Sequence, residues 1–189
     1  GYDGSYNNET WVYDFSADTW TQKSPSAKPS GRAYHGMAYI GDDQVLFFGG
    51  WDGSNHNDTW VYDLSANAWT QKSPQNNGSI PTARRFVGMD YIGGDQVLLF
   101  GGYPYNNQTW LYDLSDDTWT QKSTSPTPSA RNGHEMTYIG GDQVLLFAGK
   151  NSSKILVNDT WVYDLSANTW TQKSPQNNGS IPSARRRFG

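Results

Sequence analysis

The stretch Gln96-Val-Leu-Leu-Phe-Gly-Gly102 is followed by Thr109-Trp-Leu-Tyr-Asp113 and then by Trp119-Thr-Gln-Lys-Ser123, and close copies of this combination run along the whole chain. The first Trp of each copy recurs every 49 to 51 residues, at Trp11, Trp60, Trp110 and Trp161. A fixed period of this length indicates one supersecondary unit per repeat, and such a unit buries its apolar face only by stacking against its neighbours.

Each repeat contains four short segments that predict β-strands. In the first segment His35, Met37 and Tyr39 alternate with Gly36 and other small or apolar residues, which is the period-two pattern of a strand with two different faces. Val-Leu-Leu-Phe is apolar at every position and predicts a strand that is covered on both faces. The third segment carries Trp and Tyr on one face, and the last carries one Trp and then polar residues, as expected of an outer strand. One repeat is therefore predicted to form one four-stranded antiparallel blade.

Two kinds of turn join these predicted strands. Gly-Asp and Gly-Gly-Asp sequences follow the first strand and suit a hairpin, because Gly and Asp adopt turn conformations readily. Between the third and fourth strands, an Asn or Asp always stands four residues after the Asp of the Tyr-Asp pair. We expect this residue to adopt the left-handed conformation.

A strand that ends in a double glycine, followed by Tyr-Asp and by a Trp seven residues after that Tyr, resembles the kelch motif. The resemblance covers essentially the whole chain, with Ala148 in place of the first glycine in the third pair. It implies an all-β fold, a β-propeller of four-stranded antiparallel kelch blades similar to the propeller of the galactose oxidase-like superfamily. Kelch propellers usually have more blades than this chain supplies, so we expect about three and a half blades in a partial or oligomer-completed ring.

Alignment of the copies predicts where the blades lie. A half blade with strands three and four occupies residues 1–25, complete blades occupy 31–74, 83–123 and 130–175, and 183–189 begin another blade. Gly1 aligns with the second glycine of the recurring pair. An open arc exposes strand edges and apolar blade faces, which soluble proteins avoid. We therefore expect further blades, either from the same longer chain or from another copy.

Composition excludes several classes of function. The 189 residues carry a net charge of -4 and the sequence pI is about 5.2, so nothing favours a nucleic acid partner. No apolar run reaches the length that spans a bilayer, so we expect no membrane insertion. The chain has no Cys, which excludes disulfides, thiolate metal sites, cysteine nucleophiles and the Tyr-Cys copper site of galactose oxidase.

The recurring polar residues are predicted to be structural. Arg32, Arg84, Arg131 and Arg185 hold one position in every blade, and a residue that recurs in this way is more often required by the fold than by a ligand. His35 and His134 have no neighbours at metal-ligand spacing and are interpreted as strand histidines. The Asp-Gly-Ser segments at Asp3 and Asp52 resemble the opening of a calcium loop but lack its Glu. We predict no catalytic residue, no cofactor and no metal site.

Seven Asn-x-Ser/Thr sequons favour an extracellular or cell-surface location. They lie at Asn8, Asn57, Asn77, Asn107, Asn151, Asn158 and Asn178, and four of them stand three residues before the first Trp of a blade. Asn and Thr are also natural turn and strand-entry residues, so duplication of a blade would copy a sequon without any selection for glycans.

The candidate partner contact is the loop from Lys150 to Asn158, which is the longest connection between a glycine pair and the next strand. It is the only such loop that contains Ile155, Leu156 and Val157, and these three residues together with Lys150 are predicted to contact another blade, chain or domain. The alternative is that they cover their own blade.

Three hypotheses for function follow. The first is a non-catalytic scaffold of a secreted or cell-surface protein that binds a protein or glycan through its loops. The second is a structural subunit that assembles into a fibre, layer or closed ring. The third is the propeller of a larger carbohydrate-active enzyme whose catalytic site lies elsewhere.

Overall fold

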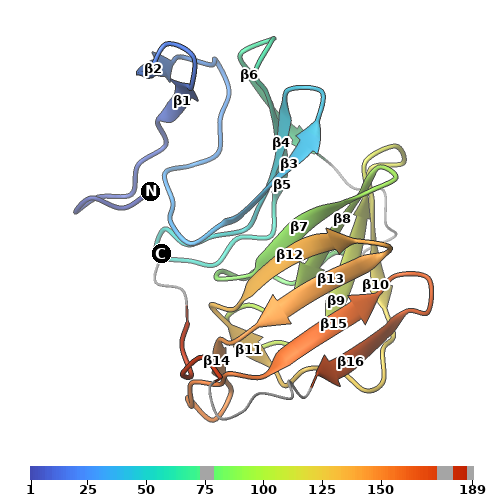
Figure 1. Ribbon diagram of the computed structural model, residues 1–189. Coiled ribbons are helices and arrows are strands. Elements are labelled where there is room, and N and C mark those ends of the chain that lie inside the picture. Colours follow the sequence, from blue (N-terminus) through green and yellow to red (C-terminus); the bar gives the residue numbers. More distant parts are fainter. Residues whose placement is uncertain (73–78, 174–180, 187–189) are drawn as a thin grey trace.

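The computed structural model describes residues 1–72, 79–173 and 181–186. Every regular element of this part of the chain is a β-strand (Figure 1). The strands are β1 (Thr10–Asp14), β2 (Thr19–Lys23), β3 (Gly36–Gly41), β4 (Gln44–Phe48), β5 (Thr59–Asp63), β6 (Ala68–Lys72), β7 (Gly88–Gly93), β8 (Gln96–Phe100), β9 (Thr109–Asp113), β10 (Thr118–Lys122), β11 (Arg131–Asn132), β12 (Glu135–Gly140), β13 (Gln143–Phe147), β14 (Lys150–Asn151), β15 (Thr160–Asp164) and β16 (Thr169–Lys173). The described residues contain no helix long and apolar enough to cross a membrane.

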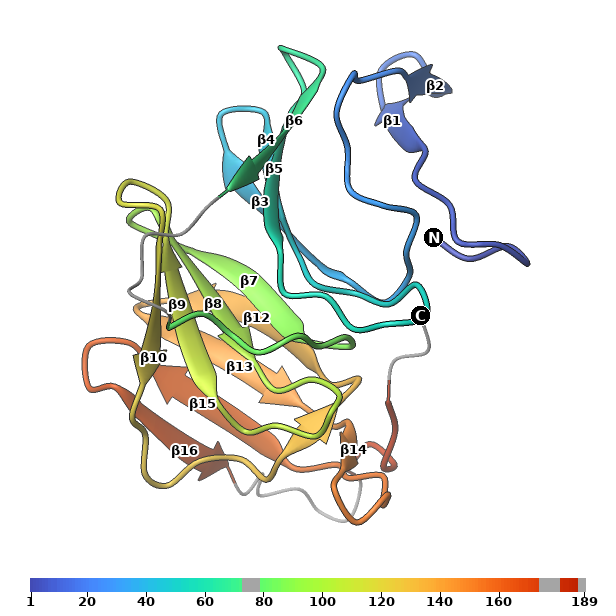
Figure 2. The same ribbon diagram turned by 180° about the vertical axis from the view of Figure 1, so that it is seen from behind.

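The strands form three four-stranded antiparallel sheets, in the orders β3-β4-β5-β6, β7-β8-β9-β10 and β12-β13-β15-β16. The first strands of neighbouring sheets, β3, β7 and β12, contact one another in succession. Figures 1 and 2 show the three sheets side by side in an arc, with the β1-β2 hairpin beyond β3–β6 at one end. The predicted fold class, a propeller of four-stranded kelch blades, is confirmed.

The core lies between the blades, because the second strand of each blade is apolar on both faces. Val97, Leu98, Leu99 and Phe100 of β8 have no solvent exposure. Alternate residues of this strand belong to two different clusters, one shared with the preceding blade and the other with the following blade. The run Val-Leu-Leu-Phe is therefore buried on both sides by neighbouring sheets, as its composition predicts.

The outer strands are attached to the neighbouring blade by a recurring tryptophan. Trp119 of β10 donates its indole N–H to Thr59 Oγ1 of the preceding blade at 3.0 Å, and Trp170 donates in the same way to Thr109 at 2.9 Å. Trp69 makes the same bond to Thr10 of the half blade at 2.9 Å. These bonds explain why a Trp and a Thr recur in every copy.

The turn between the third and fourth strands requires the left-handed conformation, as predicted. The residue four positions after the Asp of the Tyr-Asp pair has φ between 49° and 53° in every copy, at Asp18, Asn67, Asp117 and Asn168. The first glycine of each pair is also left-handed, and a Cβ added at Gly49 would lie 2.5 Å from the carbonyl oxygen of Arg84. Ala148 occupies the equivalent place in the third pair with φ of 66°.

Gly1 occupies the place of the second glycine of a pair in the half blade. The Gly1 amino group donates to the carbonyl oxygen of Arg32 at 2.8 Å, as Gly50 donates to Arg84 at 3.0 Å. β1 pairs only with β2, and a cleft of about 580 Å³ lies between this hairpin and the blade that contains β3.

Candidate binding face

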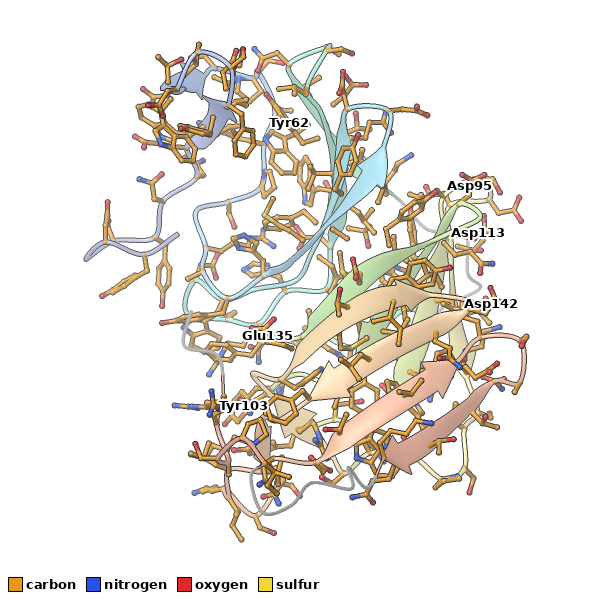
Figure 3. All side chains as sticks on the ribbon, in the orientation of Figure 1. Tyr62, Asp95, Tyr103, Asp113, Glu135 and Asp142 are labelled. Carbon is orange, nitrogen blue, oxygen red and sulfur yellow. The ribbon has the colours of Figure 1, made fainter. Side chains whose placement is uncertain are left out.

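The two edges of the arc differ in structure. One edge carries the hairpin turns, which are joined in each blade by a backbone bond such as that from Leu114 N to Asp95 O at 2.8 Å. We call this the turn edge. The opposite edge, here named the loop face, carries the loops 51–58, 103–108 and 150–159 and the linkers 30–34, 82–86 and 129–133. Figure 3 shows Asp95, Asp113 and Asp142 at the turn edge and Tyr103 at the opposite edge.

The recurring arginines form the framework of the loop face. The guanidinium groups of Arg32 and Arg131 each donate to a carboxylate of their own blade, Asp58 at 2.5 Å and Asp159 at 2.6 Å. Each also donates to the carbonyl oxygen of the first residue of the glycine pair. Arg84 makes the same contacts with Gly101 and with the neutral side chain of Gln108. The three arginines are buried and bind residues of their own blades, so they are structural, as their recurrence predicts.

Burial and pairing shift the pKa values of this framework. Burial of the Asp58 carboxylate favours its neutral form, but hydrogen bonds from Arg32 and Trp60 outweigh burial and leave the pKa of Asp58 below its usual range. The pKa of Asp159 is lowered by the same balance. Arg84 has no carboxylate partner, and burial lowers its pKa to about 10.

Residues that differ from blade to blade lie on top of this framework. The residue after each glycine pair bonds across to the residue after each recurring arginine, so that Trp51 faces Ala33 and Tyr103 faces Arg85. In the third complete blade β11 and β14 form the same contact, and Asn132 faces Lys150. Variation at these positions makes each blade chemically distinct on the loop face.

Arg85 is the centre of an aromatic cluster. Its guanidinium carbon lies 4.1 Å from the centroid of the Trp51 ring and 4.6 Å from that of Tyr103, and Nη1 donates to Asn55 Oδ1 at 2.9 Å. The neighbouring Phe86 ring lies 4.3 Å from the Tyr34 ring. These contacts span the first two complete blades and hold the arginine in place.

Tyr34 and Phe86 have φ of 63° and 56°, which is unfavourable for bulky residues. Backbone hydrogen bonds between blades hold both residues in this conformation. Phe86 N donates to Tyr34 O at 2.9 Å, and Gly133 N donates to Phe86 O at 3.1 Å. A chain of backbone bonds therefore runs from blade to blade. Strain of this kind is concentrated at functional surfaces, and the strained residues stand next to the aromatic cluster.

A cavity of about 610 Å³ opens on the loop face beside this cluster. Its lining includes four cationic side chains and two tyrosines, namely Arg85, Lys150, Lys154, Arg186, Tyr103 and Tyr105. A volume of this size accommodates a small ligand or a short peptide segment.

The loop that contains the predicted partner contact forms one rim of the cavity. It folds back as a hairpin in which Asn151 N donates to Ile155 O at 2.9 Å and Val157 N donates to Gly149 O at 3.0 Å. Ile155 is 60% exposed and Leu156 is 41% exposed, so neither is covered by its own blade. Lys150 lines the cavity itself. The role of these residues in partner binding stays a prediction.

Arg85, Trp51 and Tyr103 were not predicted from the sequence, and Lys154 was included only as part of the loop from Lys150 to Asn158. The sequence does carry one signal for these positions. The residues that follow each glycine pair and each recurring arginine differ from copy to copy, whereas the second glycine of each pair and the arginine recur. That signal does not show that Lys150 and Arg85, from different repeats, border the same cavity.

The histidines and the Asp-Gly-Ser turns have structural contacts. His35 and His134 each lie one residue before a strand rather than in it, and their rings pack against Phe47 at 4.3 Å and Phe100 at 5.5 Å. Asp52 accepts from Ser54 N, and its carboxylate lies 2.8 Å from His56 Nε2. Within residues 1–72, 79–173 and 181–186, no three His, Asp or Glu side chains gather as metal ligands.

The structure gives the in-register sequons a second explanation. In three of the four the third residue is a Thr that accepts a Trp indole, namely Thr10, Thr59 and Thr109. In three of them the second residue binds the recurring arginine, namely Asp58, Gln108 and Asp159. The asparagines at the first position, Asn8, Asn57 and Asn107, are exposed, whereas Asn151 and Asn158 are partly buried. Asn158 Nδ2 donates to Pro182 O at 3.2 Å. Asn77 and Asn178 lie outside the described residues.

Comparison with protein families identifies the repeat. Residues 1–102 of the 189 match the model of the KLHDC2/KLHL20/DRC7 Kelch-repeats domain. The match covers more than half of the chain, and the chain therefore belongs to the kelch-repeat family. Kelch repeats generally mediate protein interactions, and kelch-repeat domains are generally non-catalytic scaffolds. No curated protein matches the chain.

Proposed function

We propose that this chain is a non-catalytic kelch scaffold that binds a partner protein through its loop face. The observation that carries the proposal is the contrast between two sets of residues on that face. Recurring residues such as Arg84 and Arg131 are buried in the framework, whereas the residues around the 610 Å³ cavity differ from blade to blade. Tyr, Trp and Arg, which form the aromatic cluster, are the residue types that most often dominate the free energy of protein binding.

The exposed side chains of the cavity rim favour a protein partner over a glycan. Ile155 and Leu156 stand in solvent next to Lys150, and apolar side chains in this setting gain free energy when a partner covers them. A location outside the cell or on its surface belongs to the same proposal and is supported by the exposed sequons Asn8, Asn57 and Asn107.

Substitution of the rim tests the proposal. The double variant Ile155→Ser, Leu156→Ser leaves the framework contacts intact, so the melting temperature should stay that of the parent. Purified chain carrying a photo-crosslinker at Tyr103 should capture a defined set of proteins from the source cells, and the double variant should lose that set. A matched control replaces exposed Met37 and Tyr39 of β3, which do not line the loop-face cavity. Capture that survives in the rim variant and is lost in the control would contradict the proposal.

End-to-end assembly is the second candidate function, and one specific pair of residues favours it. Glu9 Oε2 accepts from the Trp11 indole at 2.9 Å, as Asp58 accepts from Trp60 at 2.7 Å, so Glu9 holds the position that binds the recurring arginine. Among the described residues no arginine binds Glu9, and the Arg185 guanidinium donates to Ser183 of its own linker and to no carboxylate. Arg185 of one copy and Glu9 of another have the charges to complete the recurring pair.

A charge exchange tests this assembly. Sedimentation velocity should show association of the parent chain that is weakened by Glu9→Arg and by Arg185→Glu. Mixing the two single variants should restore association, because each then supplies the charge that the other lacks. A parent chain that is monomeric at every concentration, or single variants that associate as the parent does, would exclude this mode of assembly.

A further inference from the structure

Charge is distributed unequally between the two edges of the arc. The chain has a net charge of -4, yet no Asp or Glu lines the loop-face cavity, whereas Arg85, Lys150, Lys154 and Arg186 do. Many of the acidic residues lie instead in or next to the hairpin turns of the turn edge, where Figure 3 shows Asp95, Asp113 and Asp142. A cationic cavity on an acidic protein is not explained by overall composition.

Three cations of the cavity, Arg85, Lys150 and Lys154, stand outside the salt bridges that stabilise the fold. Salt bridges of the described residues include those of Arg32, His56 and Arg131. Arg85, Lys150 and Lys154 form none of them, although Asp58 and Asp159 lie on the same side of the arc, because those carboxylates are already held by the framework arginines. Arg85 is fixed by the Trp51 and Tyr103 rings and by a neutral amide, so its charge is positioned without being neutralised.

We propose that the loop-face cavity binds an acidic segment of the partner protein. Carboxylates of that segment face Arg85, Lys150 and Lys154, and an apolar residue of the segment packs against Ile155 and Leu156 at the rim. Arginine in particular binds a carboxylate through two parallel N–H donors. This inference rests on the proposed function and names the chemistry of the partner.

An acidic peptide fits the site better than an acidic glycan does. Lys150 belongs to the same hairpin as Ile155 and Leu156, and its backbone pairs with that of Leu156, so the charged and apolar parts of the site are adjacent. A peptide supplies both carboxylate and aliphatic side chains, whereas a uronate sugar supplies a carboxylate and hydroxyl groups but no aliphatic side chain.

Binding of a defined probe tests the proposal on the full chain. The probe is a fluorescein-labelled peptide that alternates Glu and Leu, and its counterpart has Gln in place of every Glu. Fluorescence anisotropy should show binding of the Glu peptide that weakens as salt is raised, and little binding of the Gln peptide. Lys150→Gln and Lys154→Gln should each weaken binding by about fivefold, the upper end for a solvent-exposed ion pair.

Matched variants and a competing ligand complete the experiment. Lys28→Gln and Lys122→Gln change the net charge equally but lie outside the cavity, and they should bind the peptide as the parent does. Circular dichroism melting checks that all four variants are folded. Equal binding of the Glu and Gln peptides would overturn the charge proposal while leaving the loop face as a binding surface. Equal weakening by the control variants, or displacement of the peptide by oligogalacturonate at lower concentration than by unlabelled peptide, would also overturn it.

Discussion

Trp119 tests the claim that neighbouring blades are held together by the recurring tryptophan of the outer strand. Trp119 is 2% exposed, packs at 5.2 Å from the Phe48 ring and at 5.0 Å from the Tyr112 ring, and donates its indole N–H to Thr59. Trp20 stands at the same position in the half blade and is 65% exposed. The chain therefore contains its own matched control for a Trp→Ala substitution.

The expected cost of Trp119→Ala combines two effects. Truncation of a buried aromatic residue costs about 3–5 kcal/mol, because packing contacts are lost and a cavity remains. Thr59 is 1% exposed, and loss of the indole donor leaves its Oγ1 without that hydrogen bond. An unsatisfied buried polar group adds about 1 kcal/mol or more to the loss of stability. Exposed Trp20→Ala should cost within about 0.5 kcal/mol.

The assay is urea denaturation followed by far-ultraviolet circular dichroism, because fluorescence would change with the number of tryptophans. Total stabilities of about 5–15 kcal/mol are common, so Trp119→Ala should remove a large part of the stability and lower Tm by roughly 10 °C. A midpoint for Trp119→Ala that equals that of Trp20→Ala would refute the packing argument.

Three further predictions follow from the same contacts. Trp110→Ala should also destabilise the array by about 3–5 kcal/mol, since Trp110 is 3% exposed in the core between the first two complete blades, and an unchanged Tm would show that it does not contribute. The folded-state pKa of Asp58 is depressed, so its stabilising effect is complete above the unfolded pKa of about 3.9 and is lost as pH falls through the folded value. Urea midpoints should therefore fall steeply below about pH 4, and Asp58→Asn should be less stable near neutral pH with a weaker dependence on acid. Mass spectrometry of the native protein should find glycans on exposed asparagines such as Asn57 and on the linker residues Asn77 and Asn178 before Asn158, whose amide is bonded to Pro182, and unmodified asparagine at all seven sequons would remove the glycan proposal.

The sequence predicts the blades well because each blade is built from local signals. Val-Leu-Leu-Phe must be covered on both faces, and Asn67 with its equivalents must be left-handed, and both constraints are visible within a few residues. The prediction that His35 and His134 lie in strands was wrong by one residue, because β3 and β12 begin directly after them. The period-two alternation of side chains extends to the histidines although the strand ladder does not. Strand ends are fixed by ladder hydrogen bonds, which a pattern of side chains does not show.

The binding face was predicted only in part, for a different physical reason. The loop at Lys150 was identified because its length and its apolar residues are unusual within one repeat. The cavity requires Arg85 and Tyr103 from one repeat and Lys154 from the next, and these residues meet only when the blades stack. Differences between copies indicate which positions are free to specialise, but the distances between those positions are set by the packing of the core.

Hydrogen–deuterium exchange with the Glu-Leu peptide is the most direct test of the central claim that recurring residues build the fold and blade-specific residues bind. The peptide should slow exchange in residues 82–86, 103–108 and 150–157 and leave the turn-edge residues 114–117 and 165–168 unchanged. Protection at the turn edge, or protection spread evenly over all blades, would contradict the division of roles between framework and loop face.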